Sequence, residues 1–416
     1  MTEISALEDL LRPRLAEFGI TRLADTTGLD RTGIPTASAV KPGTADVIWV
    51  YSGKGRSQPH ARAVAIMECL ERTCALWPWA ADTVVCSAAE LDDRSPWPVW
   101  APSRFTEGQR RTAATAPIPW VNGRLVSGTG CVWLPADMVF TGHRPAHVRA
   151  ASPFRVRTSN GLGAALDLDA AILHALYEVA ERDIVSHYEL IASHAGLSFL
   201  AAVGAQTGID VGWLANVYRD DVSSAVTVDL RTLPPTAREL VDRFSAAGLQ
   251  VVVKALPNDF NLPAFGAACL EQISIAHVLG CAGYGVRGDP EEALLAALLE
   301  LAQTRATDLQ GAREDRHDIE KRRLPRTLNH HWLATPGEPT SYDTASAQFM
   351  RIPEEPLGHV LHAFESAGLA DVAVVEFAAP DGIAAVRVLV PGVETWHCTG
   401  GEAMLGPRLS KKVNHG

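Results

Sequence analysis

The sequence lacks the features of a secreted, membrane-spanning or nucleic-acid-binding protein. Its seven cysteines are scattered and form no Cys-x-x-Cys pair, so neither a disulfide framework nor a zinc site is indicated. No uncharged apolar run reaches membrane-spanning length, and the acidic, amphipathic start has no apolar signal core. The formal net charge is −11 and basic clusters with interleaved aromatics are missing, which disfavours a nucleic-acid partner. These absences predict a cytoplasmic protein with reduced cysteines.

What is present is an ordinary globular composition. The 416 residues are 47% hydrophobic and 20% charged, which is enough for a large core and more than one lobe. Hydrophobic periodicity predicts helices at 6–18, 59–77, 237–247 and 357–369, and strands at 48–51, 225–230, 250–255, 372–377 and 384–390. Residues 96–120 are expected to be irregular, 124–140 to form short strands, and 312–342 to form a mobile loop or lid. The predicted class is α/β (α+β), with mixed sheets and glutamate-bearing helices.

A long helix after the turn sequence Thr-Ser-Asn-Gly at 158–161 carries the first group of candidate site residues. Its apolar residues recur at helical spacing as one buried stripe, and Glu178 and Glu181 share the opposite face. Residues three apart on a helix are neighbours, so these carboxylates can hold one cation between them, with Arg182 beside them as a fixed positive charge. A solvated helix face is the alternative interpretation.

A second copy of this Glu-x-x-Glu-Arg pattern lies on the helix predicted after Gly53-Lys54-Gly55. It consists of Glu68, Glu71 and Arg72, and small apolar neighbours such as Val64 indicate partly buried carboxylates. Such carboxylates need a cation or hydrogen-bond donors to remain charged. Lys54 lies in the Gly-Lys-Gly loop that leads into this helix and is suited to a phosphate contact. The loop is not a P-loop, because the spacing of its glycines and lysine differs from that motif.

A third helix is predicted to begin at Asp289-Pro290, which is a strong cap with proline in the first turn. Its next turns are apolar on every side except at Glu300, and Gln303 and Arg305 follow. An apolar helix is a buried helix, and a carboxylate within it must be paired or bind a ligand. A buried Glu300–Arg305 pair is the structural alternative.

Other motifs point to less. The glycines at 283, 285 and 288 match a dinucleotide fingerprint in letters only, and we interpret them as a tight turn. No Ser/His/Asp or Cys/His triad can be assembled, so no catalytic residue is assigned. His174 lies one turn before Glu178 on the same face, so contact with the site is one interpretation, and a hydrogen-bonded structural histidine is the preferred one.

Three helices that present paired carboxylates and arginines suit a polyphosphate site. Carboxylate and amide oxygens hold Mg²⁺, the ions bridge phosphate oxygens, and arginines neutralise charge that develops during transfer. The candidate binding residues are Lys54, Glu68, Glu71, Arg72, Glu178, Glu181, Arg182, Glu300, Gln303 and Arg305, with Glu68, Glu71, Glu178 and Glu181 as metal ligands.

These stretches, in this order, resemble the YcaO family. The resemblance rests on Ser-Gly-Lys-Gly at 52–55, Met-Glu-Cys-Leu-Glu-Arg at 67–72, Thr-Ser-Asn-Gly-Leu at 158–162, Tyr-Glu-Val-Ala-Glu-Arg-Asp at 177–183, Gly-Tyr-Gly at 283–285, Glu-Leu-Ala-Gln-Thr-Arg at 300–305 and Val-Pro-Gly-Val-Glu at 390–394. Residues 19–40 resemble the N-terminal part of YcaO proteins that work with TfuA-type partners. The domains expected are an N-terminal segment (1–45), a YcaO catalytic domain (46–400) and a C-terminal tail (401–416).

The resemblance implies an ATP-binding fold in which helical glutamates hold Mg²⁺ and nucleotide, and it implies ATP-dependent modification of a peptide backbone amide. A nucleophile adds to the amide carbonyl, the oxyanion is phosphorylated by ATP, and loss of phosphate leaves a thioamide, an azoline or an amidine. The ten candidate residues become nucleotide, phosphate and metal contacts. The implied partners are a ribosomal precursor peptide, a TfuA-like or E1-like protein and a second copy of the chain.

Two departures shape the choice of activity. Val64 stands where the family usually has a serine, and the residues after 405 have no proline-rich stretch of the kind found in many azoline-forming members. Thioamide formation in the biosynthesis of a ribosomal peptide is the activity expected first, with a cyclodehydratase that makes azolines or a macroamidine as the alternative. Val64 motivates a further hypothesis, a noncatalytic peptide-binding subunit. ATP-dependent chemistry on a non-peptide metabolite is a separate one.

Overall fold

The computed structural model describes most of the chain. The described residues are 3–78, 83–94, 99, 107–126, 128, 130–142, 158–207, 225–274, 277–312, 332–352, 356–395 and 408. Most of the loop or lid predicted at 312–342, and all of the predicted tail except Arg408, lie outside them. None of the helices in the described part is long and apolar enough to cross a bilayer.

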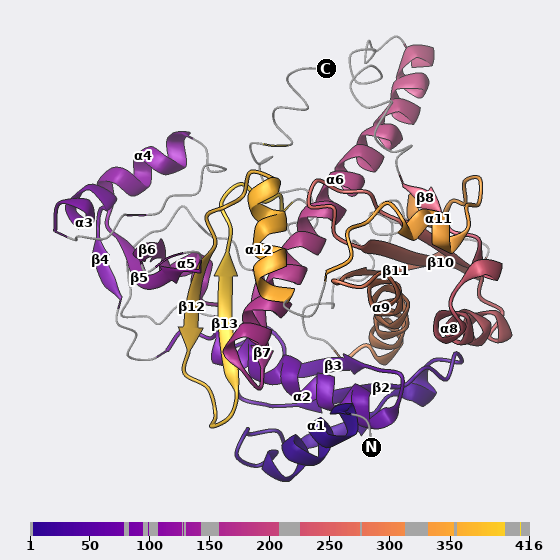
Figure 1. Ribbon diagram of the computed structural model, residues 1–416, viewed down its shortest axis with the longest axis horizontal. Helices are drawn as coiled ribbons and strands as arrows, with labels where there is room; N and C mark the ends of the chain where they lie inside the picture. The colour runs from indigo at the N-terminus through magenta and orange to yellow at the C-terminus, as the bar shows by residue number, and fades with distance from the viewer. Residues whose placement is uncertain are drawn as a thin grey trace.

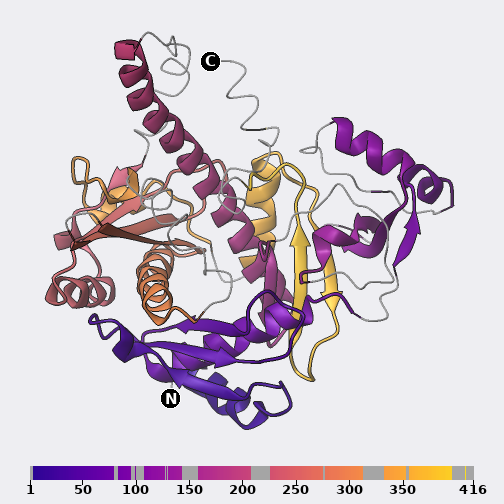
Figure 2. The same cartoon turned by 180° about the vertical axis from the view of Figure 1, so that it is seen from behind.

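Three sheets are connected by helices (Figures 1 and 2). The first has the order β1 (Arg22–Asp25), β2 (Thr36–Val40), β3 (Val50–Lys54). The second has the order β11 (His277–Val286), β10 (Ala264–Ser274), β9 (Val251–Ala255), β8 (Val226–Thr227). The third has the order β4 (Val84–Cys86), β5 (Ile118–Leu125), β12 (Ala373–Phe377), β13 (Ala384–Leu389), β7 (Leu162–Ala165), with β6 (Cys131–Pro135) paired to β5. The ladders between these strands are antiparallel, and only isolated bridges are parallel.

The helices surround and separate these sheets. They are α1 (Glu3–Leu11), α2 (Gln58–Cys74), α3 (Ala88–Arg94), α4 (Glu107–Thr115), α5 (Ala136–Val139), α6 (Leu168–Thr207), α8 (Pro235–Ala246), α9 (Pro290–Gln310), α11 (Tyr342–Ser346) and α12 (Pro356–Ser366). Figure 1 shows α6 crossing the molecule between the second sheet and the pair β12–β13 with α12. The predicted α+β class is confirmed.

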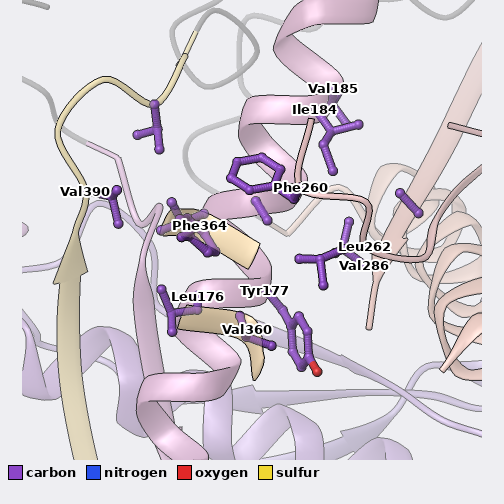
Figure 3. Close-up of a cluster of buried hydrophobic side chains, with 14 of the residues drawn as sticks. Leu176, Tyr177, Ile184, Val185, Phe260, Leu262, Val286, Val360, Phe364 and Val390 are labelled. Atoms are coloured by element: carbon purple, nitrogen blue, oxygen red, sulfur yellow. The ribbon is translucent and has the colours of Figure 1, made fainter. Parts of the chain in front are cut away.

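The central helix α6 is held by a core that combines both flanking layers. Leu176 and Ile184 of α6 pack in one cluster with Phe260, with Phe364 of α12 and with strand residues of both sheets (Figure 3). The ring centroids of Phe260 and Phe364 are 4.7 Å apart. Full burial of one such side chain contributes about 2–3 kcal/mol, so this packing fixes the position of α6 firmly. The glutamates on α6 therefore lie on a rigid element.

The helix start predicted at Asp289-Pro290 is confirmed, and α6 begins at a cap of the same kind. Asp289 accepts hydrogen bonds from the backbone N–H groups of Glu291 and Glu292, at 2.8 and 3.2 Å, and Pro290 opens α9. Asp167 caps α6 by accepting from Ala170 N at 2.8 Å. These caps satisfy N–H groups that the first helical turn leaves without partners, so the helix starts that precede the glutamates are set locally.

The tight turn predicted at the glycines 283–288 is confined to Gly288, which lies in the bend between β11 and α9. Gly283 and Gly285 lie inside β11, where α9 crosses the strand. A Cβ at Gly283 would stand 2.2 Å from the backbone N of Leu301, and one at Gly285 would stand 2.2 Å from the carbonyl oxygen of Ala293. The glycines therefore allow the backbone of β11 to contact the backbone of α9, which brings Glu300 of the same helix close to β3.

The sequence analysis missed one hairpin and misjudged one region. The hairpin β10–β11 was not predicted, because its strands are covered on one face by α6 and on the other by α9 and so show no alternation of polar and apolar residues. Part of the region 96–120, expected to be irregular, forms α4 and the start of β5. Strand β2, in the predicted N-terminal segment, pairs with β3, in the predicted catalytic domain, from Thr36–Lys54 to Val40–Val50, and the boundary at 45/46 remains a prediction.

Candidate functional site

The turn at 158–161, which precedes β7 and α6, is hydrogen-bonded to the third sheet. Gly161 has φ +83° and its carbonyl oxygen accepts a hydrogen bond from Val388 N of β13 at 2.7 Å. A Cβ at this position would stand 2.3 Å from the carbonyl oxygen of Val388, so only glycine fits. The N–H of Gly161 donates to Glu178 Oε2 at 3.3 Å. The turn thus positions the first glutamate of α6.

The glutamates of α6 share one arginine, as their spacing predicts. Arg182 lies 3.7 Å from Glu178 and 3.5 Å from Glu181, measured between the closest guanidinium nitrogen and carboxylate oxygen. The side chains of the two glutamates are 19% and 7% exposed, so this is not a solvated helix face. One guanidinium at these distances compensates two carboxylates incompletely.

Helix α2 brings the second pair toward α6. His174 of α6 lies 3.8 Å from Glu71, and Glu178 acts electrostatically on Glu71, as does Glu68 one turn earlier. Arg72 points elsewhere and makes two hydrogen bonds of 2.9 Å to Asp46. The fold therefore brings Glu68 and Glu71 together with the glutamates of α6. The guanidinium of Arg72 is instead hydrogen-bonded to Asp46, which is not one of these glutamates.

Helix α9 and strand β3 complete the group. Lys54 Nζ donates to Glu300 Oε2 at 2.9 Å, and Glu300 in turn acts electrostatically on Glu181. Gln303 donates its side-chain N–H to the carbonyl oxygen of Ser52 at 2.6 Å, which ties α9 to β3. We use the name glutamate cluster for Glu68, Glu71, Glu178, Glu181 and Glu300, which three helices bring together.

Burial dominates the electrostatics of the glutamate cluster. Burial raises the pKa of Glu178 to about 7, with Glu181 adding to the rise and Arg182 opposing it. Burial and then the charges of Glu178 and Glu68 raise the pKa of Glu71 well above its ordinary value. Burial and Glu300 raise that of Glu181. A cluster in this state binds protons or added cations readily.

His174 contributes to the site although the sequence suggested a structural role. Its side chain is 49% exposed and it faces Glu71. The predicted interpretation as a hydrogen-bonded structural histidine finds no support in these contacts.

Arg305 lies apart from the glutamate cluster. It is 2% exposed and donates to both carboxylate oxygens of Asp30, at 3.1 and 3.0 Å. Its third contact is Glu271 of β10, at 3.0 Å. These partners connect α9 to the N-terminal segment and to the second sheet. The phosphate contact expected at Arg305 remains a prediction, and the alternative pair with Glu300 does not form.

Two arginines of the site were missed by sequence reasoning. Arg287 acts electrostatically on Glu181 and His174, and its guanidinium lies 5.8 Å from the ring centroid of Tyr177. Arg387 of β13 is 3% exposed and acts on Glu71 and Glu178. Its signal was present in the sequence, because it is the one charge within the apolar strand 384–389, and a buried charge requires a partner.

The donor set fits Mg²⁺ together with a nucleotide. Within the part of the chain that the structure describes, no three acidic, histidine or cysteine side chains come close enough to form a metal cage by themselves. Mg²⁺ does not need such a cage, because it is bound by one or two carboxylates together with substrate phosphates and water. The glutamate cluster offers the carboxylates, and Lys54, Arg182, Arg287 and Arg387 offer charge for phosphates. The arrangement is chemically suited to a nucleotide with a divalent cation.

Comparison with known proteins agrees with this class. The family described as YcaO cyclodehydratase, ATP- and Mg²⁺-binding, matches residues 52–394. The chain therefore belongs to the YcaO family, and the cofactors predicted, ATP and Mg²⁺, are those in the family's description.

Relatives and solved structures cover nearly the whole chain. An uncharacterized protein of Methanothermobacter thermautotrophicus is 31% identical over 390 residues, with 92% of each chain covered. An uncharacterized protein in the tfuA 3′ region of Rhizobium leguminosarum bv. trifolii is 27% identical over 407 residues, with 92% of this chain and 86% of that one covered.

Among solved structures, the YcaO of Methanopyrus kandleri bound with AMPPCP and Mg²⁺ has a TM-score of 0.68 at 23% identity, covering 97% of this chain and 94% of that one. A heterocyclase in complex with substrate and cofactor has a TM-score of 0.67 at 18% identity, covering 93% of this chain and 52% of that one. At these identities the two structures support the fold alone.

Proposed function

We propose that this protein uses ATP to activate a backbone amide of a ribosomally synthesised precursor peptide and that its product is a thioamide. The observation that carries the proposal is the glutamate cluster. Three helices bring together five carboxylates, of which that of Glu181 is buried and the others are half-buried, and the pKa of Glu178 rises to about 7. Carboxylates that are grouped in this way at raised pKa values suit a Mg²⁺–ATP site better than a structural network in which each carboxylate has a close counter-charge of its own.

The residues divide the work by charge. Glu68, Glu71, Glu178 and Glu181 are the proposed Mg²⁺ ligands, and Lys54 and Arg182 the proposed phosphate contacts. Bound Mg²⁺–ATP supplies the phosphoryl group that turns an amide oxygen into a leaving group. The chain's own residues orient the reactants and stabilise developing negative charge, which is the larger part of catalysis in phosphoryl transfer.

A thioamide is favoured over an azoline by one comparison. The rhizobial relative is named for its place in a tfuA 3′ region and is similar over 92% of this chain. We infer that a TfuA-like protein is the partner that supplies sulfur, and that the chain acts as a homodimer. An E1-like partner belongs to the alternative, in which the same site makes an azoline or a macroamidine.

Val64 motivates a second candidate, a noncatalytic peptide-binding subunit. The residue lies one helical turn before Glu68 on α2 and has no hydroxyl to contribute. ATP turnover separates the two candidates. An active enzyme forms ADP in the presence of precursor, whereas a peptide-binding subunit forms none, and only then would Val64→Ser restore activity.

The test of the proposed function is a mass-spectrometric comparison of cells that express the wild-type chain, with its TfuA-like partner, and cells that express Glu178→Gln. The proposal expects peptides that exchange one oxygen for sulfur in the wild-type cells only, and these peptides identify the precursor. Peptides that lose one water instead assign the chain to azoline or amidine formation. Identical peptides in both cells, with no ADP formed by the purified protein and partner, contradict an enzymatic role.

A further inference from the structure

A small cavity lies next to the glutamate cluster, between the turn before α6 and the end of β13. Thr158, Asn160, Val179 and Arg387 contribute to its wall, as do Met138 and Val388. Its volume is about 20 Å³. A cavity of roughly 10–15 Å³, measured in this way, holds one water molecule, so this one admits a single small molecule and excludes a peptide group.

Asn160 places a buried hydrogen-bond acceptor in the cavity wall. The residue is 8% exposed, and its side-chain oxygen Oδ1 has no hydrogen-bond partner among the residues that the structure describes. Its backbone N–H donates to Thr158 Oγ1 at 2.9 Å, so the residue is held in place. A buried acceptor without a partner costs about 1–3 kcal/mol. A ligand that donates one hydrogen bond would remove this cost.

The cavity also carries one buried positive charge. Arg387 is 3% exposed and donates through Nη1 to the carbonyl oxygen of Thr158 at 2.9 Å. The rest of the wall includes the valines 179 and 388 and the thioether of Met138. A cation among apolar side chains favours an anion of low hydration, and a thioether and methyl groups suit a polarisable atom.

The position of the cavity connects it to the chemistry. Asn160 precedes Gly161, whose N–H donates to Glu178, and Val179 follows Glu178 in α6. Arg387 acts electrostatically on Glu71 and Glu178. An anion held in this cavity therefore stands beside the proposed site of amide activation.

We propose that this cavity binds hydrosulfide, HS⁻, as the nucleophile for thioamide formation, with its charge at Arg387 and its S–H donated to Asn160 Oδ1. The inference rests on the proposed function. Hydrosulfide satisfies the four observations together, since it is small, anionic and polarisable and has one hydrogen to donate. Chloride lacks the hydrogen, and water lacks the charge.

Kinetics with sodium hydrosulfide in place of the partner protein test the role of Asn160. Asn160→Leu removes the acceptor, and we expect the KM for hydrosulfide to rise by about 10-fold or more while the KM for ATP is unchanged. Asn160→Asp keeps the shape but adds a negative charge and is expected to raise the KM for hydrosulfide further. Asn122→Leu is the matched control, because Asn122 of β5 also has a buried Oδ1 without a partner but does not line the cavity.

A crystal of the wild-type protein soaked in bromide gives a readout that does not depend on activity. Anomalous density for bromide beside Arg387, absent in Arg387→Gln, is the expected result. An ordered water only, or an unchanged KM for hydrosulfide in both Asn160 variants, overturns the inference. If the product is an azoline and needs no hydrosulfide, the proposed function fails instead, and the two failures are therefore distinguishable.

Discussion

Two sets of charged residues in this protein are both buried but differ in how well their charges are matched. In one set, Arg305 donates to both oxygens of Asp30 at 3.1 and 3.0 Å and contacts Glu271 at 3.0 Å. In the glutamate cluster, Arg182 stands 3.5 and 3.7 Å from two glutamates and serves both. In the first set the guanidinium makes direct hydrogen bonds to one carboxylate, whereas in the second set one guanidinium lies at longer distances from two carboxylates.

The difference separates structural from functional charge. A matched buried pair holds elements together, and breaking it leaves an uncompensated charge. The glutamate cluster contributes little to stability as it stands, because burial raises the pKa values of Glu71, Glu178 and Glu181. A bound cation would add its charge to that of the lysine and arginines already there. Pairing distances therefore indicate function more clearly than the number of charged residues does.

The largest expected effect comes from breaking the matched set. Arg305→Ala leaves the carboxylate of Asp30, 4% exposed, without its guanidinium. We expect the free energy of unfolding to fall by about 3–5 kcal/mol, measured by urea denaturation. Arg231→Ala is the control, since Arg231 forms an exposed pair with Asp229 and its loss is expected to have little effect. A stable Arg305→Ala protein that binds no ATP would instead support the predicted phosphate contact.

The next effect concerns activity. Glu178→Gln removes a carboxylate from the centre of the glutamate cluster while keeping its shape, and we expect about a 100- to 1,000-fold loss of ATP-dependent product, as for removal of one main electrostatic group. Thermal stability is expected to be unchanged or slightly higher, because a partly protonated buried acid is replaced by a neutral amide. Glu376→Gln, at an exposed pair with Arg124, is the matched control. Full activity in a folded Glu178→Gln protein contradicts the assignment of the site.

A smaller effect is expected at the one described residue of the tail. Arg408 donates to Asp183 of α6 at 2.7 and 2.8 Å and contacts Asp259. Arg408→Ala is expected to lower the free energy of unfolding by about 2 kcal/mol, the loss of charge-assisted hydrogen bonds. In a double-mutant cycle, Asp183→Asn should absorb most of this loss. Strict additivity of the two substitutions would show that Arg408 and Asp183 do not stabilise the fold as a pair.

The smallest effect is a change in the pH dependence of stability. The pKa of Glu178 is raised from 4.5 to about 7, so the folded chain binds this proton more tightly than the unfolded chain does. Its contribution to stability is therefore fully present below pH 4.5 and is lost as the pH rises to 7. Glu178→Gln should flatten this decline, because the amide does not titrate. Parallel pH profiles of the two proteins would contradict the raised pKa.

Much of the fold and of the glutamate cluster could be predicted, because the signals are local. Glutamates three residues apart share a helix face, and Asp289-Pro290 opens a helix wherever the rest of the chain lies. The capping, the spacing and the single carboxylate at Glu300 in an apolar helix each follow from a few consecutive residues. The structure adds which of these local features meet.

The errors arose where the role of a residue depends on contacts with residues far away in the sequence. Asp30 lies 275 residues from Arg305 in the sequence, so no spacing rule relates them. The strands β10 and β11 are buried on both faces and carry no alternating pattern, and the glycines of β11 serve contact with α9 rather than a turn. Arg387 was overlooked because its strand was interpreted only as core, although its charge in an apolar strand was visible.

The most direct test of the central claim is calorimetry of nucleotide binding, which needs no precursor peptide. AMPPCP is titrated into the protein at pH 7 with Mg²⁺, in buffers of different ionisation enthalpy. If the glutamate cluster is the Mg²⁺–nucleotide site, binding requires Mg²⁺ and releases protons, because a cation displaces protons from carboxylates whose pKa values are raised. Glu178→Gln should weaken binding and release fewer protons. Binding without proton release that is equally tight in Glu178→Gln, or no Mg²⁺-dependent binding at all, contradicts the account.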